Sequence, residues 1–342
     1  MARYDVTVRG AGIFGLSIAY EAARRGAKVQ VIETVAIGAG SSGGLVGALT
    51  PHVPDSWNAK KAFQLESLLM AQAFWDGVAR AGGADAGYTR LGRLQPIADG
   101  AGVDLARARA AGAAQHWGDH AVWELRPATG AAWEPASPSG YLVYDSLSAR
   151  LHPRRAGAAL AAAIIALGGR VSLGDAADQG QVVWATGLSG LADLGRDLGR
   201  PMGGGVKGQA ALLEWDASTL PQVYADNLHI VPHSDGTVAI GSTSENTWDD
   251  AAATDDKLDA LITRARAIVP ALASARVIDR WAGIRPRAIT RAPILGAWPN
   301  RAGHFVANGG FKIGFGMAPK IAQVMADLVL DGRDTIPLDF RI

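Results

Sequence analysis

The sequence of 342 residues contains no cysteine. This absence excludes disulfide bonds, thiolate metal sites and a cysteine nucleophile. An excess of charge of one sign is also lacking, because 33 basic and 32 acidic residues give a formal net charge of +1. Such a balance offers no field that would attract nucleic acid or an anionic membrane surface. We therefore expect no nucleic-acid partner.

Long hydrophobic runs are missing as well. The longest, at 156–169, is shorter than the roughly 20 residues that a membrane-spanning helix requires, so we expect a buried helix there and no membrane span. Residues 1–9 run straight into a strand pattern and lack the charged start, apolar stretch and small-residue cleavage site of a secretory signal. These features predict a cytoplasmic location.

The seven histidines form no metal-ligating pattern. His116 and His120 have the i, i+4 spacing of two helical ligands, but Gly118 interrupts a helix there and no third ligand is evident. We expect no metal.

The first 33 residues have the order strand, glycine turn, helix, strand. Gly10, Gly12 and Gly15 satisfy G-x-G-x-x-G, whose glycines permit a tight turn and close approach of the backbone to a pyrophosphate. Glu33 ends the second strand, where a carboxylate can accept hydrogen bonds from a ribose diol and would repel the 2′-phosphate of NADP. The segment predicts a dinucleotide site and leaves NAD and FAD open.

The rest of the chain alternates between nucleotide-domain patterns and β-rich patterns. A helical pattern covers 60–80, short turn-punctuated segments cover 87–144, β-rich segments begin after Pro201, and a helix is expected at 256–268. An alanine-rich helix followed by strands near 171–184, and a C-terminal strand, glycine turn and long helix, return to the nucleotide-binding pattern. We therefore expect an α/β fold with two interleaved domains. The Rossmann-like dinucleotide-binding domain comprises 1–55, 145–200 and 285–342, and the β-rich substrate domain, a mixed sheet with helices, comprises 56–144 and 201–284.

Seven segments in their order along the chain resemble one known family. They are VRGAGIFGLSIAYEAARRGAKVQVIE, GAGSSGGLVGALTPH, VVWATGLSG, VKGQAALLE, HIVPHSDGTVAIGSTSE, RWAGIRPRAITRAPILG and NGGFKIGFGMAPKIAQVMADL. The sequence is similar to the D-amino-acid oxidase and glycine oxidase family of FAD-dependent oxidoreductases. The resemblance implies FAD as cofactor. Because the sequence has no cysteine, attachment of the flavin through a cysteine sulfur is excluded, and we expect non-covalent FAD.

The resemblance also implies which residues hold the cofactor. In the family, the C-terminal glycine turn approaches the isoalloxazine ring, and the following helix directs its positive end at the ring, where it stabilises the negative charge of reduced flavin. Pro319 is expected in the first turn of that helix. The implied cofactor residues are Gly10, Gly12, Ile13, Phe14, Gly15, Glu33, Ser41, Ser42, Gly44, Leu45, Ala185, Thr186, Gly187, Gly310, Lys312, Ile313, Gly314 and Phe315.

The candidates for the substrate site are Arg285, Lys312, His229 and His52, with Arg287 beside Arg285. Arg285 stands where the family has an arginine that binds the substrate carboxylate, and Arg287 shares its face if the segment is a strand. Lys312 replaces an arginine of glycine oxidases, and His229 stands where D-amino-acid oxidases have a tyrosine. His52 follows the predicted flavin loop. The two replacements leave the identity of the substrate open.

The resemblance implies oxidation of the C–N bond of a D-amino acid, glycine or N-alkyl glycine. Hydride passes from Cα to flavin N5, and water converts the imino acid to an oxo acid. The electrons then pass to O₂ or another acceptor, and homo-oligomerisation stays open. Three alternatives remain: an FAD-dependent 2-hydroxy-acid dehydrogenase, a flavoprotein that demodifies carboxymethylaminomethyl-uridine in tRNA, and a flavin-binding protein without catalytic activity.

Arg9, directly before the first glycine, is unusual in a strand that is buried on both faces. It is expected either to pair with a nearby carboxylate at the strand end or to add positive charge beneath the pyrophosphate.

Overall fold

The computed structural model describes residues 4–342. One of its sheets has six strands in the order β15-β16-β9-β1-β2-β8. Neighbouring strands are parallel except β15 and β16, which are antiparallel. The strands are Val6–Arg9 (β1), Val29–Glu33 (β2), Arg170–Leu173 (β8), Gln181–Trp184 (β9), Ile294–Ala297 (β15) and His304–Asn308 (β16).

A second sheet has eight strands in the order β14-β10-β13-β12-β11-β4-β6-β5. It is antiparallel except where β4 and β11 pair in parallel. A short antiparallel pair, Ala48–Leu49 (β3) with Ala149–Arg150 (β7), joins two distant segments. The strands of the second sheet are Arg93–Pro96 (β4), Trp123–Pro127 (β5), Tyr141–Asp145 (β6), Gly203–Glu214 (β10), Gln222–Ala225 (β11), Leu228–Pro232 (β12), Thr237–Gly241 (β13) and Arg276–Ala288 (β14).

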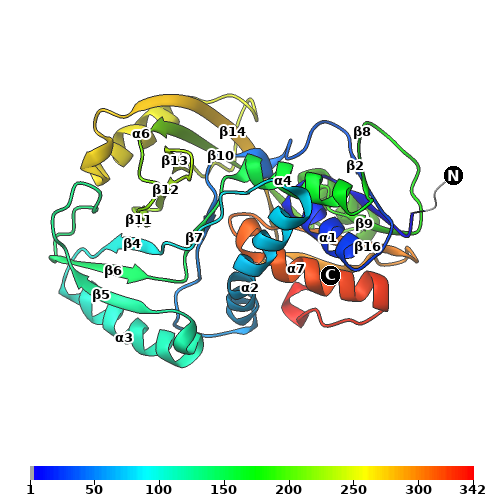
Figure 1. Cartoon of the computed structure of the whole chain (residues 1–342), viewed down its shortest axis with the longest axis horizontal. Helices are drawn as coiled ribbons and strands as arrows, with labels where there is room; N and C mark the ends of the chain where they lie inside the picture. Colours follow the sequence, from blue (N-terminus) through cyan, green and yellow to red (C-terminus); the bar gives the residue numbers. More distant parts are fainter. Residues whose placement is uncertain (1–3) are drawn as a thin grey trace.

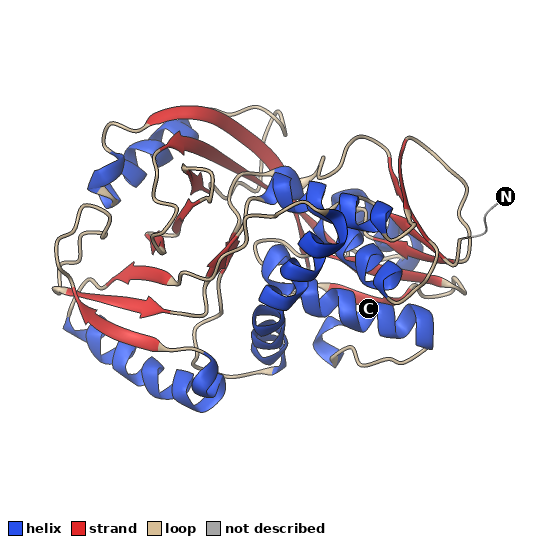
Figure 2. Ribbon diagram, viewed as in Figure 1, coloured by secondary structure: helices blue, strands red, loops and turns tan. Residues whose placement is uncertain are grey.

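The helices lie mainly around the six-stranded sheet. They are Ile13–Arg24 (α1), Ala59–Gly82 (α2), Gly100–Trp117 (α3), Pro153–Ala166 (α4), Gly187–Leu198 (α5), Asp256–Ile268 (α6) and Gly314–Asp331 (α7). In Figure 1 the eight-stranded sheet curves along the left side with α3 and α6 outside it, whereas α1, α4 and α7 surround the other sheet on the right. Figure 2 shows the same division by element type. The predicted α/β class is confirmed.

The α3 helix corrects one sequence-based expectation. Only short segments were expected between 87 and 144, yet 18 residues of this stretch form one helix. Asp99 caps it by accepting a hydrogen bond from the Gly102 N–H at 2.8 Å, and the buried face consists of Val103, Ala106, Ala113 and Trp117. Their spacing follows the helical period, but three glycines and many alanines weaken the amphipathic contrast.

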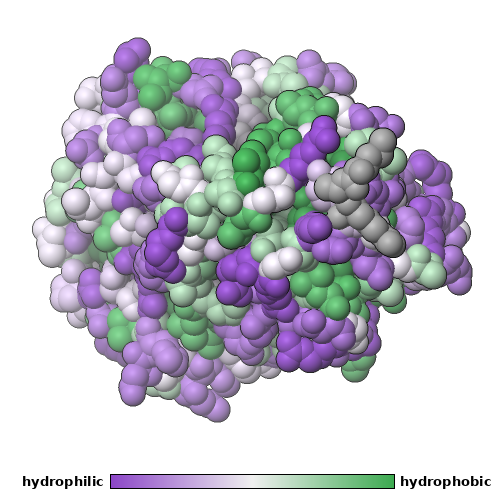
Figure 3. Space-filling model, turned by 45° about the vertical axis from the view of Figure 1, so that its right-hand side comes forward, coloured by the Kyte–Doolittle hydropathy of each residue, from purple (hydrophilic) through white to green (hydrophobic). Residues whose placement is uncertain are grey.

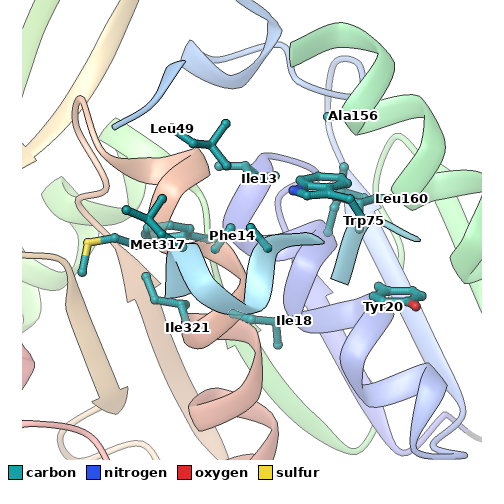
Figure 4. Packing of buried hydrophobic residues seen from close by; sticks show 14 of the residues in the cluster. Ile13, Phe14, Ile18, Tyr20, Leu49, Trp75, Ala156, Leu160, Met317 and Ile321 are labelled. Carbon is teal, nitrogen blue, oxygen red and sulfur yellow. The ribbon is translucent and has the colours of Figure 1, made fainter. Parts of the chain in front are cut away.

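The largest core cluster lies between α1, α2, α4 and α7. Figure 4 shows its side chains meeting from all four helices, among them Phe14, Trp75, Leu160 and Met317. The α2 helix, which falls in the predicted substrate domain, thus packs on helices of the predicted nucleotide-binding domain. The domain boundaries themselves stay a prediction.

The face in Figure 3 mixes hydrophilic residues with smaller hydrophobic patches. Large apolar side chains that reach solvent include Val35, Ile165 and Leu173. Within residues 4–342, no helix combines the length and the apolar character needed to cross a bilayer.

Leu160 and Ile165 on α4 form a matched pair for testing this core. Leu160 is 0% exposed and Ile165 is 57% exposed. Leu160→Ala is expected to lower the free energy of unfolding by about 2–5 kcal/mol, because it removes buried methyl groups and leaves a cavity. Ile165→Ala, with the same loss of carbon on the solvent side, is expected to change it by less than about 1 kcal/mol. Denaturant unfolding of both variants measures this, and equal losses would contradict the assigned helix faces.

Candidate cofactor and substrate site

The glycine turn between β1 and α1 lies against the end of β9. Gly10 has φ +102°, and a Cβ there would stand 2.5 Å from the carbonyl oxygen of Ala185. The Glu33 carboxylate accepts a hydrogen bond from the Ala11 N–H at 2.9 Å. Ser42 Oγ accepts one from the Ile13 N–H at 2.9 Å, in the first turn of α1. Four segments far apart in the sequence therefore meet around one helix N-terminus, which favours an anion such as a pyrophosphate.

The loop around the short 3₁₀ helix Ser41–Gly43 connects the two sheets. Arg154 Nε donates to the Gly43 carbonyl oxygen at 3.0 Å, and its Nη1 pairs with Asp279 Oδ2 of β14 at 2.8 Å. A Cβ on Gly44 would stand 3.3 Å from the Trp281 ring. Neither Arg154 nor Trp281 was identified from the sequence, because each acts only through contacts between distant segments.

The turn after β9 contains a polar atom without a partner. Thr186 Oγ1 is buried and makes no hydrogen bond with the described residues. A Cβ on Gly190 would clash with this hydroxyl, and Asn308 Nδ2 holds the Gly187 carbonyl oxygen at 2.8 Å. A buried hydroxyl left unpaired beside an anion-binding helix start is the kind of group that a ligand satisfies. The glycine turn, Ser42, Glu33 and Thr186 therefore fit a dinucleotide cofactor.

The C-terminal glycine turn packs on the beginning of α1. A Cβ on Gly310 would stand 2.7 Å from Phe14 Cζ, and one on Gly314 would stand 3.4 Å from Ile13 Cγ2. The α7 helix begins at Gly314, directly after Ile313, and Phe315 is its second residue. The turn that was expected to face the flavin and the turn that was expected to hold the pyrophosphate are thus in direct contact.

The position of Pro319 differs from the expectation. The residue is the sixth of α7 and lies beyond the first turn, so its missing N–H removes a helical hydrogen bond. Ser67 of α2 accepts a hydrogen bond from the next N–H, that of Lys320, at 3.2 Å. A side chain from α2 therefore takes part in satisfying the interrupted helix.

Arg285 lies in β14 with its guanidinium over the backbone of β10. A Cβ on Gly208 would stand 2.7 Å from Arg285 Cζ, so glycine is what makes room for the charge. Nη1 donates to Ser242 Oγ at 2.5 Å, and Nη2 donates to the carbonyl oxygens of Thr243 and Lys207 at 2.6 and 3.2 Å. Nε is buried without a partner, and burial lowers the pKa of Arg285 to about 10.

Phe311, between Gly310 and Lys312, has three cations around its ring. Arg285 Cζ, Arg287 Cζ and Lys312 Nζ lie 5.4, 5.7 and 5.7 Å from the ring centre. The residue has φ +44°, a conformation that bulky side chains rarely adopt and that clusters at functional sites. Phe311 was not identified from the sequence, and its place in the glycine turn was the available signal.

His229 lies in β12 with its ring 4.6 Å from that of Tyr224. Burial, together with the charges of Arg93 and Lys312, lowers the pKa of His229 to about 3. Its Nδ1 is buried without a hydrogen-bond partner among the described residues. The histidine is therefore neutral at ordinary pH and belongs to the same cationic surroundings as Lys312.

His52 and His116 make other contacts. The backbone N–H of His52 donates to Gln64 Oε1 of α2 at 2.8 Å, the ring Nδ1 also contacts that oxygen, and burial lowers the pKa of His52. His116 stacks on Trp57 with a centroid distance of 4.2 Å. In residues 4–342 no group of three or more potential ligands is placed to hold a metal ion.

Arg9 pairs with carboxylates at the end of β1. Its Nε lies 2.7 Å from Asp178 Oδ1 and its Nη1 lies 3.4 Å from Asp175 Oδ1, and Nη2 donates to the Ala176 carbonyl oxygen at 2.9 Å. Of the two expectations for Arg9, the structure shows the carboxylate pairing.

Comparison with known proteins points to one family. The family described as FAD dependent oxidoreductase (DAO) matches residues 5–328. The chain is 28% identical to glycine oxidase of Geobacillus kaustophilus over an alignment of 359 positions, gaps included, which covers 96% of this chain and 93% of the relative. It is also 28% identical to the putative thiamine biosynthesis oxidoreductase ThiO of Rhizobium etli, over 95% of this chain and 96% of the relative.

The fold agrees with these similarities. The crystal structure of glycine oxidase from Geobacillus kaustophilus superposes with a TM-score of 0.86 at 25% identity, covering 99% of this chain and 97% of that one. The overall fold is therefore shared over nearly the whole length of both chains.

The close approach at Gly10 can be tested against Gly26. Both have positive φ, +102° and +91°, but a Cβ on Gly26 would meet nothing within 4 Å. Gly10→Ala is expected to weaken FAD binding about 10- to 100-fold, because the turn must shift away from Ala185 and strain of about 1–3 kcal/mol is introduced. Gly26→Ala carries the cost of positive φ without the clash. Fluorescence titration of both apoproteins with FAD measures the difference, and equal affinities would contradict the assignment.

Acidification tests the surroundings of His229. Because its folded pKa of about 3 lies below the usual 6.5, the unfolded chain binds the extra proton first, and His229 lowers stability as the pH falls from about 6.5 towards 3. His229→Gln is expected to make the fall of Tm with pH shallower in this range. Thermal unfolding of the FAD-saturated proteins between pH 7 and pH 4.5 measures the slope. An unchanged slope would show that His229 is solvated.

Proposed function

Because the chain belongs to the DAO family of FAD-dependent oxidoreductases, we propose that it oxidises the C–N bond of a small amino acid that carries a carboxylate. The substrate class comprises glycine, N-alkyl glycines and D-amino acids. The observation that carries the proposal is the state of Arg285. Arg285 is 7% exposed, and within residues 4–342 its guanidinium has no carboxylate within ion-pair distance.

A buried cation without a counter-ion is costly, and a bound anion removes that cost. Glu245 raises the pKa of Arg285 through its charge, but its carboxylate is already engaged by Lys257 Nζ at 2.8 Å and Thr243 Oγ1 at 2.6 Å. A substrate carboxylate is the anion that this position favours. The unpartnered Nε of Arg285 is a free donor for it.

The side chains position the substrate and leave the redox step to the cofactor. FAD, when bound, accepts the hydride that leaves the substrate Cα. The substrate becomes an imino acid, and water then converts it to an oxo acid and ammonia or an amine. Arg285 holds the carboxylate, and Lys312 adds positive charge beside it. Neutral His229 does not repel the ammonium form of an arriving substrate.

The names of the relatives support an amine as substrate. The relative from Geobacillus kaustophilus, aligned over 96% of this chain, is a glycine oxidase. Arg285 alone favours any small carboxylate, so a 2-hydroxy acid is the outcome that would overturn the amine proposal.

An anaerobic reduction screen tests the proposal. The FAD-loaded protein is mixed with glycine, N-methylglycine, D-amino acids, imino acids and 2-hydroxy acids, and loss of the oxidised flavin absorbance is followed. Bleaching by at least one amino acid is expected, with no bleaching by hydroxy acids. Reduction by hydroxy acids alone, or by none of these compounds, would contradict the proposal. Peroxide measured after admission of air shows whether O₂ is the acceptor.

Removal of the Arg285 charge is expected to impair the reaction strongly. Arg285→Gln should lower kcat/KM about 30- to 1,000-fold, which corresponds to about 2–4 kcal/mol for a buried charge-assisted contact. Arg285→Lys keeps the charge but loses donors, so its kcat/KM should lie between those of the wild type and Arg285→Gln. Gly208→Ala should mimic Arg285→Gln, because a Cβ displaces the guanidinium. Flavin content and Tm control for folding, and full activity in Arg285→Gln would place the carboxylate elsewhere.

A further inference from the structure

The site holds more positive charge than one carboxylate can balance. Arg285, Arg287 and Lys312 all lie within 5.7 Å of the centre of the Phe311 ring. Within residues 4–342, none of the three forms an ion pair with an acidic side chain, although 22 ion pairs occur elsewhere in that part of the chain. The three charges therefore repel one another, and none of them has an ion-pair partner of its own within this range.

The two outer cations are held loosely. Arg287 Nη2 donates to a neutral group, Asn246 Oδ1, at 3.4 Å. Lys312 has no ion-pair partner among the described residues, and partial burial of its ammonium group together with the charge of Arg285 lowers its pKa. By contrast, Arg285 is fixed by two carbonyl oxygens and a hydroxyl. Arg285 is thus preorganised, whereas Arg287 and Lys312 keep free donors.

The strand places the two arginines on one face. Arg285 and Arg287 are alternate residues of β14, so their side chains leave the same side about 7 Å apart along the strand. Arg287 also forms an isolated bridge to Gly310, which brings its backbone beside the C-terminal glycine turn. Both arginines and Lys312 therefore border the same turn.

We propose that the substrate amine carries two carboxylates, the first bound at Arg285 and the second at Arg287 with help from Lys312. The inference rests on the proposed function and names the substrate class of the same site. A second carboxylate a few bonds from the first spans the distance between alternate strand residues. Arg287 is the residue that distinguishes such a substrate from a monocarboxylate, because a planar guanidinium binds a carboxylate with two parallel hydrogen bonds.

Lys312 is less suited to a test than Arg287. It follows Phe311 in the turn that was expected to approach the flavin, so its removal would change cofactor and substrate contacts together. Arg287 lies in the strand of the other sheet and touches Asn246 and Phe311. A substitution there removes the proposed contact with the second carboxylate and leaves the residues of the glycine turn unchanged.

The experiment compares two pairs of compounds that differ by one carboxylate. The first pair is N-methylglycine and N-(carboxymethyl)glycine, used as substrates in anaerobic flavin reduction. The second pair is (methylthio)acetate and thiodiacetate, in which sulfur replaces nitrogen and prevents oxidation. Binding of the second pair to the FAD-loaded enzyme is measured as a Kd, from the change in the flavin spectrum.

The wild-type enzyme is expected to bind thiodiacetate at least about 10-fold more tightly than (methylthio)acetate, as a charge-assisted contact gives. It is also expected to have the lower KM for N-(carboxymethyl)glycine. Arg287→Gln should abolish both preferences and leave the constants for the monocarboxylates within about twofold. Arg276→Gln removes one positive charge from the far end of β14, where Arg276 pairs with Glu214 in solvent, and should change neither preference.

Two results separate this inference from the proposed function. If N-methylglycine reduces the flavin as well as its dicarboxylate partner, or if Arg287→Gln affects both members of a pair equally, the second carboxylate site is wrong and amine oxidation stands. If no amine reduces the flavin while thiodiacetate binds tightly in an Arg287-dependent way, amine oxidation is wrong and the dicarboxylate site stands. A loss of flavin content or of Tm in Arg287→Gln would overturn the inference in favour of a structural role.

Discussion

The pairing of β10 with β14 is the interaction on which the site depends. These strands run antiparallel from Gly203–Ala288 to Glu214–Arg276, and β14 is the edge of its sheet. At one end β14 reaches the C-terminal glycine turn, where Phe311 N–H donates to the Pro286 carbonyl oxygen at 3.1 Å. The long ribbon thus carries Arg285 from a sheet that has no nucleotide-binding pattern to the turn that begins α7. Without this pairing the basic residues would have no fixed relation to the cofactor residues.

Electrostatics favours the binding of anions at this meeting point. The α1 helix starts at a glycine turn without an acidic residue in its first turn, and Arg285 is buried among carbonyl oxygens without a counter-ion. Elsewhere, a buried arginine such as Arg93 pairs with Asp145 at 2.8 Å. Arg150, which is also buried, has no ion pair in the described part of the chain and donates to the carbonyl oxygens of Pro232 and Ser218. What distinguishes Arg285 is that two further cations lie with it around Phe311, and this grouping favours a function for the unpaired charges over a contribution to stability.

The sequence was most informative where a local pattern decides the structure. The β1–α1–β2 unit, the α6 helix and the β-rich segments after Pro201 follow from periodicity and glycine positions, and the family and FAD follow from motif order. Contacts between distant segments could not be predicted in this way. Examples are the Arg154 link between Gly43 and Asp279, the Trp281 ring on Gly44, and the three cations around Phe311. The α3 helix was missed because its glycines and alanines conceal its amphipathic face, and Pro319 was placed one turn too early because the start of α7 was not marked by a capping side chain.

The central claim is that the basic residues around Phe311 receive the carboxylates of the substrate beside the cofactor. A crystal structure of the FAD-loaded protein with thiodiacetate tests it most directly. The account predicts one carboxylate within hydrogen-bond distance of Arg285 and the other within hydrogen-bond distance of Arg287, with the ligand between Phe311 and the flavin. A ligand bound away from both arginines, or one whose second carboxylate points to solvent, would contradict the account.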